Sequence, residues 1–155
     1  DHRDLHSFPT RRSSDLSIFI LFYPVIAFSE YVGTEVCKNC HLTEYENFKK
    51  YSRMSRSFEA IEKMKHKITS EELKSCLQCH TTGYGKKGGF VSIEITPHLQ
   101  HTGCEVCHGP GKKHVETRDP RFIRKKLTLQ ICESCHTEER IRAFRFKPLL
   151  HGGAH

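Results

Sequence analysis

The stretch Cys104-Glu-Val-Cys107-His108-Gly-Pro-Gly111 contains a short pattern that occurs four times along the chain. In each copy two residues separate a pair of cysteines, and a histidine follows the second cysteine directly. The other copies are Cys37-Lys-Asn-Cys40-His41, Cys76-Leu-Gln-Cys79-His80 and Cys132-Glu-Ser-Cys135-His136. The four copies contain all 8 cysteines of this 155-residue chain, so one chemistry has to explain them together.

The spacing predicts covalent haem attachment. Residues three or four apart share one face of a helix, so both thiols can add to the vinyl groups of one haem while the next imidazole lies beneath the iron. Cys-x-x-Cys-His is the attachment pattern of c-type haem, and a neutral histidine serves as an axial iron ligand. We expect four covalently bound c-type haems. Their attachment residues are Cys37, Cys40, Cys76, Cys79, Cys104, Cys107, Cys132 and Cys135, and their proximal iron ligands are His41, His80, His108 and His136.

Zinc and disulfides are the alternatives for these cysteines. Four Cys-x-x-Cys pairs could form two zinc sites, each with four cysteine ligands, and an oxidising compartment favours disulfides. Neither use requires a histidine after every second cysteine, so haem explains more of the pattern. A zinc-binding interaction module would also be colourless, which separates it from a haem protein.

The N-terminal 29 residues predict export. Ser7-Phe-Pro-Thr-Arg-Arg-Ser-Ser-Asp-Leu16 resembles a translated sequencing adapter, so we expect residues 1–16 to be an assembly artefact; a natural polar start is the alternative. Residues 16–29 are almost wholly apolar, too short for a membrane span of about 20 residues, and typical of a signal-peptide hydrophobic region. Small side chains at Ala27 and Ser29 predict cleavage before Glu30, with an uncleaved anchor as the alternative. Bacteria attach c-type haem outside the cytoplasmic membrane, so a periplasmic or otherwise exported protein, without stable membrane insertion after cleavage, is expected.

Residues 30–155 have the length of a single domain. A chain this short buries little apolar core and needs additional stabilisation from cross-links or cofactors. We expect the haems to provide it. We expect a mainly α fold of short helices and loops wrapped around a four-haem cluster, with little β structure. The ending His151-Gly-Gly-Ala-His155 carries no recognisable stop signal, which leaves a truncated C-terminus open.

Two capping patterns predict helices. Thr43-x-x-Glu46, followed by apolar residues at helical spacing, predicts an amphipathic helix over residues 44–65. Thr69-x-x-Glu72 predicts a second cap that opens a short helix running into Cys76.

Several glycines lie between the second and third motifs. They predict turns over residues 81–89, and a short strand or hairpin near residues 88–96 with Phe90 to Ile95 as the strand. A phosphate-binding loop is not expected, because no strand precedes the glycines and neither Ser nor Thr follows the lysines. Gly109-Pro-Gly111 should end any helix after the third motif.

The formal net charge is +7. Four haems, each with two propionates, would bring the holoprotein to about +3 when oxidised or about −1 when reduced, so affinity for polyanions such as nucleic acid is not expected. The basic run Arg121-Phe-Ile-Arg-Lys-Lys126 is interpreted as a solvated face that could dock an acidic redox partner.

From Tyr31 to His136 the chain resembles the cytochrome c-554 family of exported tetrahaem cytochromes. The most specific likeness lies in the run from Cys76 through Phe90 and in Gly103 to Gly111. The resemblance implies a mostly helical fold, haems packed in close pairs, and electron transfer between redox partners in the periplasm. It also implies that the haem on Cys76, Cys79 and His80 can lack a sixth ligand and bind small molecules such as nitric oxide.

The resemblance also points to sixth ligands. The family places a ligand histidine downstream of Gly-Pro-Gly, which corresponds to His114, and another in the tail, where His151 and His155 compete. Its helix after the first motif commonly carries a tryptophan and a ligand histidine; this chain has Phe48 and Met54 there. A ligating methionine would raise the potential of its haem relative to bis-histidine haems.

Electron transfer is the leading functional expectation, because the chain offers no paired-carboxylate or nucleophile constellation and no catalytic residue is assigned. The alternative is reduction of a nitrogen oxide at an open five-coordinate haem on His80. On either hypothesis the haem irons perform the chemistry, and the protein sets their ligation, solvent access and spacing.

Overall fold

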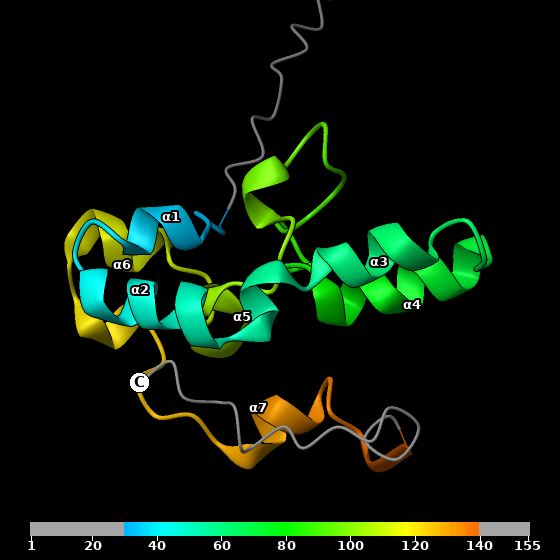
Figure 1. Ribbon diagram of the computed structural model, residues 1–155. Coiled ribbons are helices and arrows are strands. Elements are labelled where there is room, and N and C mark those ends of the chain that lie inside the picture. The colour runs from blue at the N-terminus through cyan, green and yellow to red at the C-terminus, as the bar shows by residue number, and fades with distance from the viewer. Residues whose placement is uncertain (1–29, 140–155) are drawn as a thin grey trace, which may run out of the picture.

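The computed structural model describes residues 30–139 and is mainly helical (Figure 1). The described residues contain no β-strand, which confirms the expected mainly α class. None of the described helices is both long enough and apolar enough to cross a bilayer. In chain order the helices and 3-10 turns are α1 (Thr34–Cys37), α2 (Leu42–Tyr51), η1 (Arg53–Arg56), α3 (Phe58–Met64), α4 (Ser70–His80), η2 (Pro97–Leu99), α5 (Cys104–His108), α6 (Lys112–Thr117), η3 (Pro120–Phe122) and α7 (Leu129–Glu133).

The apolar core is small and lies where α3 and α4 pack side by side as a hairpin (Figure 1). Cys76 and Leu77 of α4 pack against this core, so the second motif begins at its edge. The buried core residues are Tyr31, Phe58, Ile61, Phe90 and Leu99.

The predicted helix over residues 44–65 is wrong as a single element, because the chain breaks at Ser52. Ser52 is extended (ψ 123°), and its Oγ accepts a hydrogen bond from the Met54 amide at 3.3 Å. The Ser55 hydroxyl donates to the Ser52 carbonyl at 2.8 Å. Serine hydroxyls that bond to nearby backbone compete with helix formation, so α2, η1 and α3 replace one long helix.

The two capping predictions have different outcomes. Thr43 is not a cap, because α2 begins at Leu42 with His41 in the N-cap position and without a side-chain cap. The second capping box is confirmed: the Glu72 amide donates to Thr69 Oγ1 at 3.2 Å, and the Thr69 amide donates to the Glu72 carboxylate at 2.7 Å. The helix that it opens, α4, reaches Cys76 as predicted and continues through the second motif to His80.

The predicted strand at Phe90 to Ile95 is wrong. The Phe90 amide donates to the Thr82 carbonyl, but the backbone then turns, and the Thr96 amide donates to the Ser92 carbonyl, both at 2.9 Å. Strand backbone needs a partner for its polar groups, and here the amides of Val91 and Ile95 bond instead to the side chains of Thr96 and Ser92 within the turn. The preceding turn brings Gly89 so close to Gly83 that a side chain at Gly89 would collide with the Gly83 carbonyl.

The third motif occupies the whole of α5, which ends at His108 as predicted. Gly109 follows with φ 87°, a conformation that favours glycine and cannot continue the helix. The predicted segments 1–16 and 16–29 lie outside the described residues, as do His151 and His155.

Candidate functional site

All four motifs adopt the same local backbone. The His41 amide donates to the Cys37 carbonyl at 2.9 Å, and the His136 amide donates to the Cys132 carbonyl at 2.8 Å. The second and third motifs lie within α4 and α5. Each motif therefore closes one helical turn, which puts its two thiols and its imidazole within reach of one planar group. None of the eight motif cysteines forms a disulfide in the part of the chain that the structure describes.

Three imidazoles share an orientation that suits an iron ligand. His80, His108 and His114 each have Nδ1 against a backbone carbonyl, at 2.8, 2.6 and 3.0 Å. A carbonyl only accepts, so Nδ1 carries the proton and Nε2 keeps the lone pair that binds a metal. Metal-binding histidines commonly donate the other ring N–H in this way, and the chain therefore fits c-type haem at these positions.

Ser57, at the joint between η1 and α3, holds the second motif. Its carbonyl accepts the His80 Nδ1 proton at 2.8 Å, and its hydroxyl donates to the His80 carbonyl at 2.8 Å. The same hydroxyl oxygen accepts the Thr102 amide at 2.8 Å, and Thr102 Oγ1 donates to the Cys79 carbonyl at 2.7 Å. The proximal histidine is thus held between the α3 joint and the segment that leads into the third motif.

Arg124 holds the third motif. Its carbonyl accepts the His108 Nδ1 proton at 2.6 Å, and its amide donates to the His108 carbonyl at 2.9 Å. Its guanidinium donates to the Cys107 carbonyl at 2.6 Å. The basic run was expected to be a solvated face, and Arg124 is indeed exposed, but its guanidinium also bonds to the motif.

Glu105, inside the third motif, is buried, with 3% of its surface exposed. Its carboxylate accepts hydrogen bonds from the amides of Val32, Gly33 and Gly111 at 2.7–3.1 Å. Buried charge is tolerated when it is fully hydrogen-bonded. The sequence analysis did not single out Glu105 and so missed this anchor, which joins Val32 and Gly33 to α5.

The motifs also contact one another. α1 packs against α5, and the thiols of Cys37 and Cys104 interact: the hydrogen bond between them lowers the pKa of Cys104 and raises the pKa of Cys37. Burial raises the pKa of Cys107, with smaller contributions from the negative charge of Cys132 and Cys135. The third motif therefore lies between the first and the fourth.

His114, a predicted sixth ligand, lies beside the first motif. Its ring and that of His41 have centroids 6.2 Å apart and planes inclined by 27°. The two rings are therefore neighbours, so His114 is close enough to the first motif to be considered as a ligand there.

The structure gives less support to the other predicted sixth ligands. Met54 lies half-buried in η1, and its described hydrogen bonds involve its backbone, to Ser52 and Ser57. His151 and His155 lie outside the described residues. Among residues 30–139, no three His, Cys, Asp or Glu side chains gather closely enough to hold a metal ion on their own.

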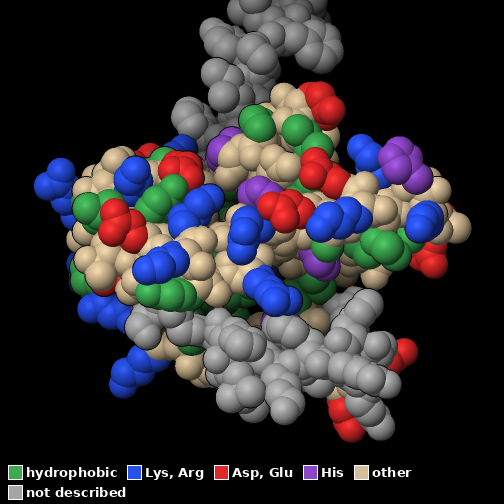
Figure 2. Space-filling model, in the orientation of Figure 1, with side chains coloured by type: hydrophobic (Ala, Val, Ile, Leu, Met, Phe, Trp, Pro, Cys, Tyr) green, Lys and Arg blue, Asp and Glu red, His purple; other side chains and the backbone are tan. Residues whose placement is uncertain are grey.

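Charge is spread unevenly over the surface. Figure 2 shows Lys and Arg side chains over α2 and its junction with α3, with carboxylates between them.

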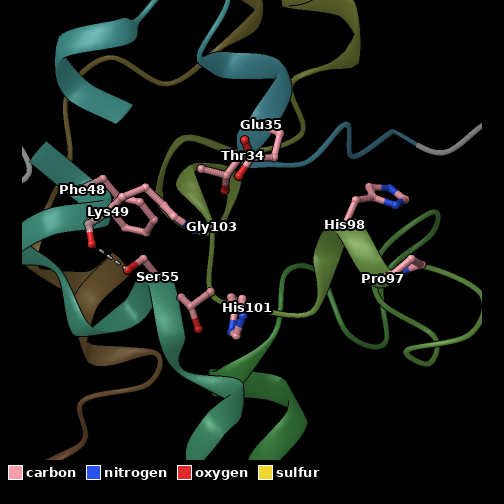
Figure 3. Close-up of a pocket in the computed structure, with 10 residues that line it drawn as sticks. Thr34, Glu35, Phe48, Lys49, Ser55, Pro97, His98, His101 and Gly103 are labelled. Carbon is pink, nitrogen blue, oxygen red and sulfur yellow. Dashed lines mark hydrogen bonds between the residues drawn. The ribbon is translucent and has the colours of Figure 1, made fainter. Parts of the chain in front are cut away.

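A cavity of about 140 Å³ lies next to α2, and neither the cysteines nor the histidines of the four motifs line it. Figure 3 shows His101 in this cavity, between Ser55 and the η2 turn that carries Pro97 and His98.

Comparisons with known proteins find similarity to cytochromes, and the stretch that matches a family profile includes the first three motifs. Residues 36–109 match the family profile described as cytochrome c554 and c-prime. Cytochrome c-554 of Nitrosomonas europaea is 30% identical over 94 residues, an alignment that covers 52% of this chain and 38% of that protein. This chain therefore spans well under half the length of that relative. No solved structure matches the chain.

Proposed function

Because residues 36–109 match the family profile of cytochrome c554 and c-prime, we propose that the protein is a tetrahaem c-type cytochrome that transfers electrons between redox partners. The observation that carries the proposal is the shared geometry of the four motifs, in which each Cys-x-x-Cys-His closes one helical turn and places two cysteines and a histidine close together. No described residue forms a separate metal cluster, so the proposed redox centres all lie at the motifs.

The proposed roles follow the motif order. The two thiols of each motif attach one haem covalently, and His41, His80, His108 and His136 bind the irons. When bound, each haem iron alternates between ferric and ferrous states and so stores one electron. The protein keeps the imidazoles neutral and oriented: burial lowers the pKa of His136, and Ser57 and Arg124 accept the Nδ1 protons of His80 and His108.

His114 is the proposed sixth ligand of the haem on His41. The support is the 6.2 Å separation of the two rings and the Asp119 carbonyl, which accepts the Nδ1 proton and leaves Nε2 as the metal-binding atom. Met54, His151 and His155 remain predicted ligands for the other irons.

A chain of haems through the third motif is the proposed electron route. Its support is the contact between Cys37 and Cys104 and the electrostatic interaction of Cys107 with Cys132 and Cys135. With the third haem between the first and the fourth, each electron transfer would take place between neighbouring haems.

The proposed partner is an acidic protein that docks on the run Arg121 to Lys126. Arg124 joins this run to the third motif, while Lys125 and Lys126 are exposed. Opposite charges guide the encounter of two proteins and speed association. Reversing both charges (Lys125→Glu with Lys126→Glu) should slow electron transfer from an acidic donor protein at low salt, and the difference should shrink at high salt because ions screen it. An equal rate in both proteins at low salt would contradict this docking site.

We further propose that residues 16–29 direct export to the periplasm, that residues 1–16 are foreign to the protein, and that residues 30–155 form one domain. Secretion of the chain from Glu30 onward behind a standard export signal, with haem maturation, provides the protein for testing.

The decisive experiment is the mass of the purified holoprotein together with low-temperature EPR of its oxidised form. A mass increase equal to four haems is expected, and a coloured protein with fewer haems would limit the proposal to the occupied motifs. Folded, colourless protein would overturn it. A high-spin ferric signal would favour the alternative of nitrogen-oxide reduction at an open haem on His80, whereas low-spin signals alone would exclude that alternative.

A further inference from the structure

One peptide group connects the proximal histidine of the second motif to a second histidine outside every motif. The Ser57 carbonyl accepts the His80 Nδ1 proton at 2.8 Å. At the other end of the same peptide bond, the Phe58 amide donates to His101 Nδ1 at 3.2 Å. The result is a continuous chain of two hydrogen bonds from His80 to His101 through one planar, conjugated unit.

Neighbouring hydrogen bonds hold this peptide group in place on both sides. The Thr82 hydroxyl donates to the His101 carbonyl at 2.6 Å. The Thr102 amide donates to Ser57 Oγ, and Ser57 Oγ donates to the His80 carbonyl, both at 2.8 Å. These bonds fix the backbone on both sides of the peptide group, at the carbonyls of His80 and His101.

His101 accepts at Nδ1, so its neutral form carries the proton on Nε2. That tautomer has no free lone pair on Nε2 and is not the one that binds iron, which gives His101 a role distinct from ligation. Protonation at Nδ1 would place an N–H opposite the Phe58 N–H and abolish the bond. Protonation of the ring therefore removes its capacity to accept this hydrogen bond.

The surroundings of His101 keep it neutral at neutral pH. Desolvation in the half-buried cavity lowers its pKa most, Lys49 lowers it further, and Glu59 and Glu62 act in the opposite direction. Charged and titratable groups face His101 from each element around the cavity. They are Glu35 of α1, Lys49 of α2, Glu59 and Glu62 of α3, and His98 of η2.

We propose that His101 is a positioning residue that sets the electron affinity of the haem on His80 through the Ser57–Phe58 peptide group. This inference rests on the proposed function. Hydrogen bonds in series polarise one another, so a neutral His101 makes the Ser57 carbonyl a stronger acceptor and His80 a more electron-rich ligand. An electron-rich ligand favours the ferric iron.

The direction of the pH effect follows. As the pH falls through the titration range of His101, the acceptor is lost and a positive charge appears near the second motif, and both changes favour the ferrous iron. Reduction of this haem should therefore become easier at low pH and should depend less on pH once His101 is fully neutral. Because linkage between two sites is reciprocal, reduction must also raise the pKa of His101.

The test compares His101→Asn with His98→Asn in the holoprotein. In the first variant the side-chain oxygen of the introduced asparagine would lie near the position of the imidazole Nδ1 and accept from Phe58 without titrating. His98 lines the same cavity and makes no bond to the peptide group, so the second variant is the matched control. Redox titrations from about pH 5 to 8, with each haem resolved by its hyperfine-shifted NMR signals, measure the reduction equilibrium of the haem on His80.

In the unmodified protein and in His98→Asn this equilibrium should change about fivefold over the range, the lower end of typical coupling between sites. It should be nearly constant in His101→Asn. Retention of the full pH dependence in His101→Asn would overturn the proposal.

A second measurement needs no variant. The NMR titration of His101 in the unmodified holoprotein should give a higher pKa in the reduced form than in the oxidised form, and equal values would overturn the proposal. Failure of the proposed function is distinguishable, because it would appear as the absence of haem from the second motif of the unmodified protein.

Discussion

The second and third motifs hold their proximal histidines with the same bond in different surroundings. His80 and His108 each donate Nδ1–H to a backbone carbonyl, at 2.8 and 2.6 Å. The carbonyl belongs in one case to Ser57, half-buried between two helices and next to buried Phe58, and in the other to Arg124 on an exposed basic segment.

This contrast indicates where each motif is sensitive. At the second motif the supporting residue is half-buried and directly precedes the core residue Phe58, so a change there should alter folding and ligation together. At the third motif the support faces solvent, where salt and a docked partner can act on it. Its buried anchor is a separate residue, Glu105. Substitutions at these supports, and a change of pH, should separate the two motifs.

Glu105→Ala should have the largest effect. Removing the carboxylate leaves three backbone donors without their acceptor, and each unsatisfied buried donor costs about 1–3 kcal/mol. We expect the free energy of unfolding, measured by denaturant titration of the holoprotein, to fall by about 3–5 kcal/mol. Glu105→Gln keeps acceptor oxygen and should lose less. A loss below about 1 kcal/mol for the alanine variant would show that α5 is not anchored at Glu105.

Ser57→Ala should come next. It removes the two hydrogen bonds of the hydroxyl, to the His80 carbonyl and from the Thr102 amide, while the carbonyl that holds the His80 ring remains. The expected loss of stability is about 1–3 kcal/mol. Ser92→Ala is the control, because Ser92 is also half-buried but its hydroxyl accepts one backbone bond, from the Ile95 amide at 3.3 Å, and this variant should lose less stability. Equal effects at the two serines would contradict the supporting role of the Ser57 hydroxyl.

Lowering the pH should reduce the stability that His101 contributes at the second motif, whereas the Arg124 support of the third motif should not respond. The pKa of His101 is lowered in the folded protein, chiefly by desolvation. A base with a depressed folded-state pKa favours folding while it is neutral, so its contribution is lost as the pH falls below the unfolded value of about 6.5 and on through the folded value. Arg124 does not titrate in this range.

Unfolding of His101→Asn and of the unmodified protein, measured from about pH 7 to 5, checks this expectation. The variant should lose less stability over that range. Identical curves for the two proteins would mean that His101 is not linked to folding.

Arg124→Ala should change stability least. It removes the guanidinium bond to the Cys107 carbonyl but leaves both backbone bonds to His108, and exposed charge interactions contribute below about 1 kcal/mol. The expected change is a shift of the hyperfine NMR signals of His108 that diminishes with added salt. Arg121→Ala, which loses an exposed ion pair with Asp119 instead, should leave those signals in place, and a shift of equal size there would assign the effect to general surface charge.

Short-range features of the fold were predictable from the chain. The capping box at Thr69 and Glu72, the stop at Gly109 and the mainly α class depend on contacts within a few residues, and all are confirmed. The long helix over residues 44–65 and the strand at Phe90 to Ile95 were wrong. In both cases local side-chain and turn bonds, from Ser52, Ser55 and Thr96, competed with the periodic pattern.

The amino-acid sequence specifies which residues the chemistry uses. The four motifs could be recognised without coordinates because attachment requires two thiols and an imidazole within one helical turn, which is a local constraint.

The surroundings of those residues follow from tertiary structure. Ser57 reaches His80 across 23 positions of the chain, Arg124 reaches His108 across 16, and Glu105 reaches Val32 across 73. No periodicity or spacing encodes contacts over such separations, because they depend on how the helices pack. The pairing of His41 with His114 and the peptide link from His80 to His101 belong to the same class.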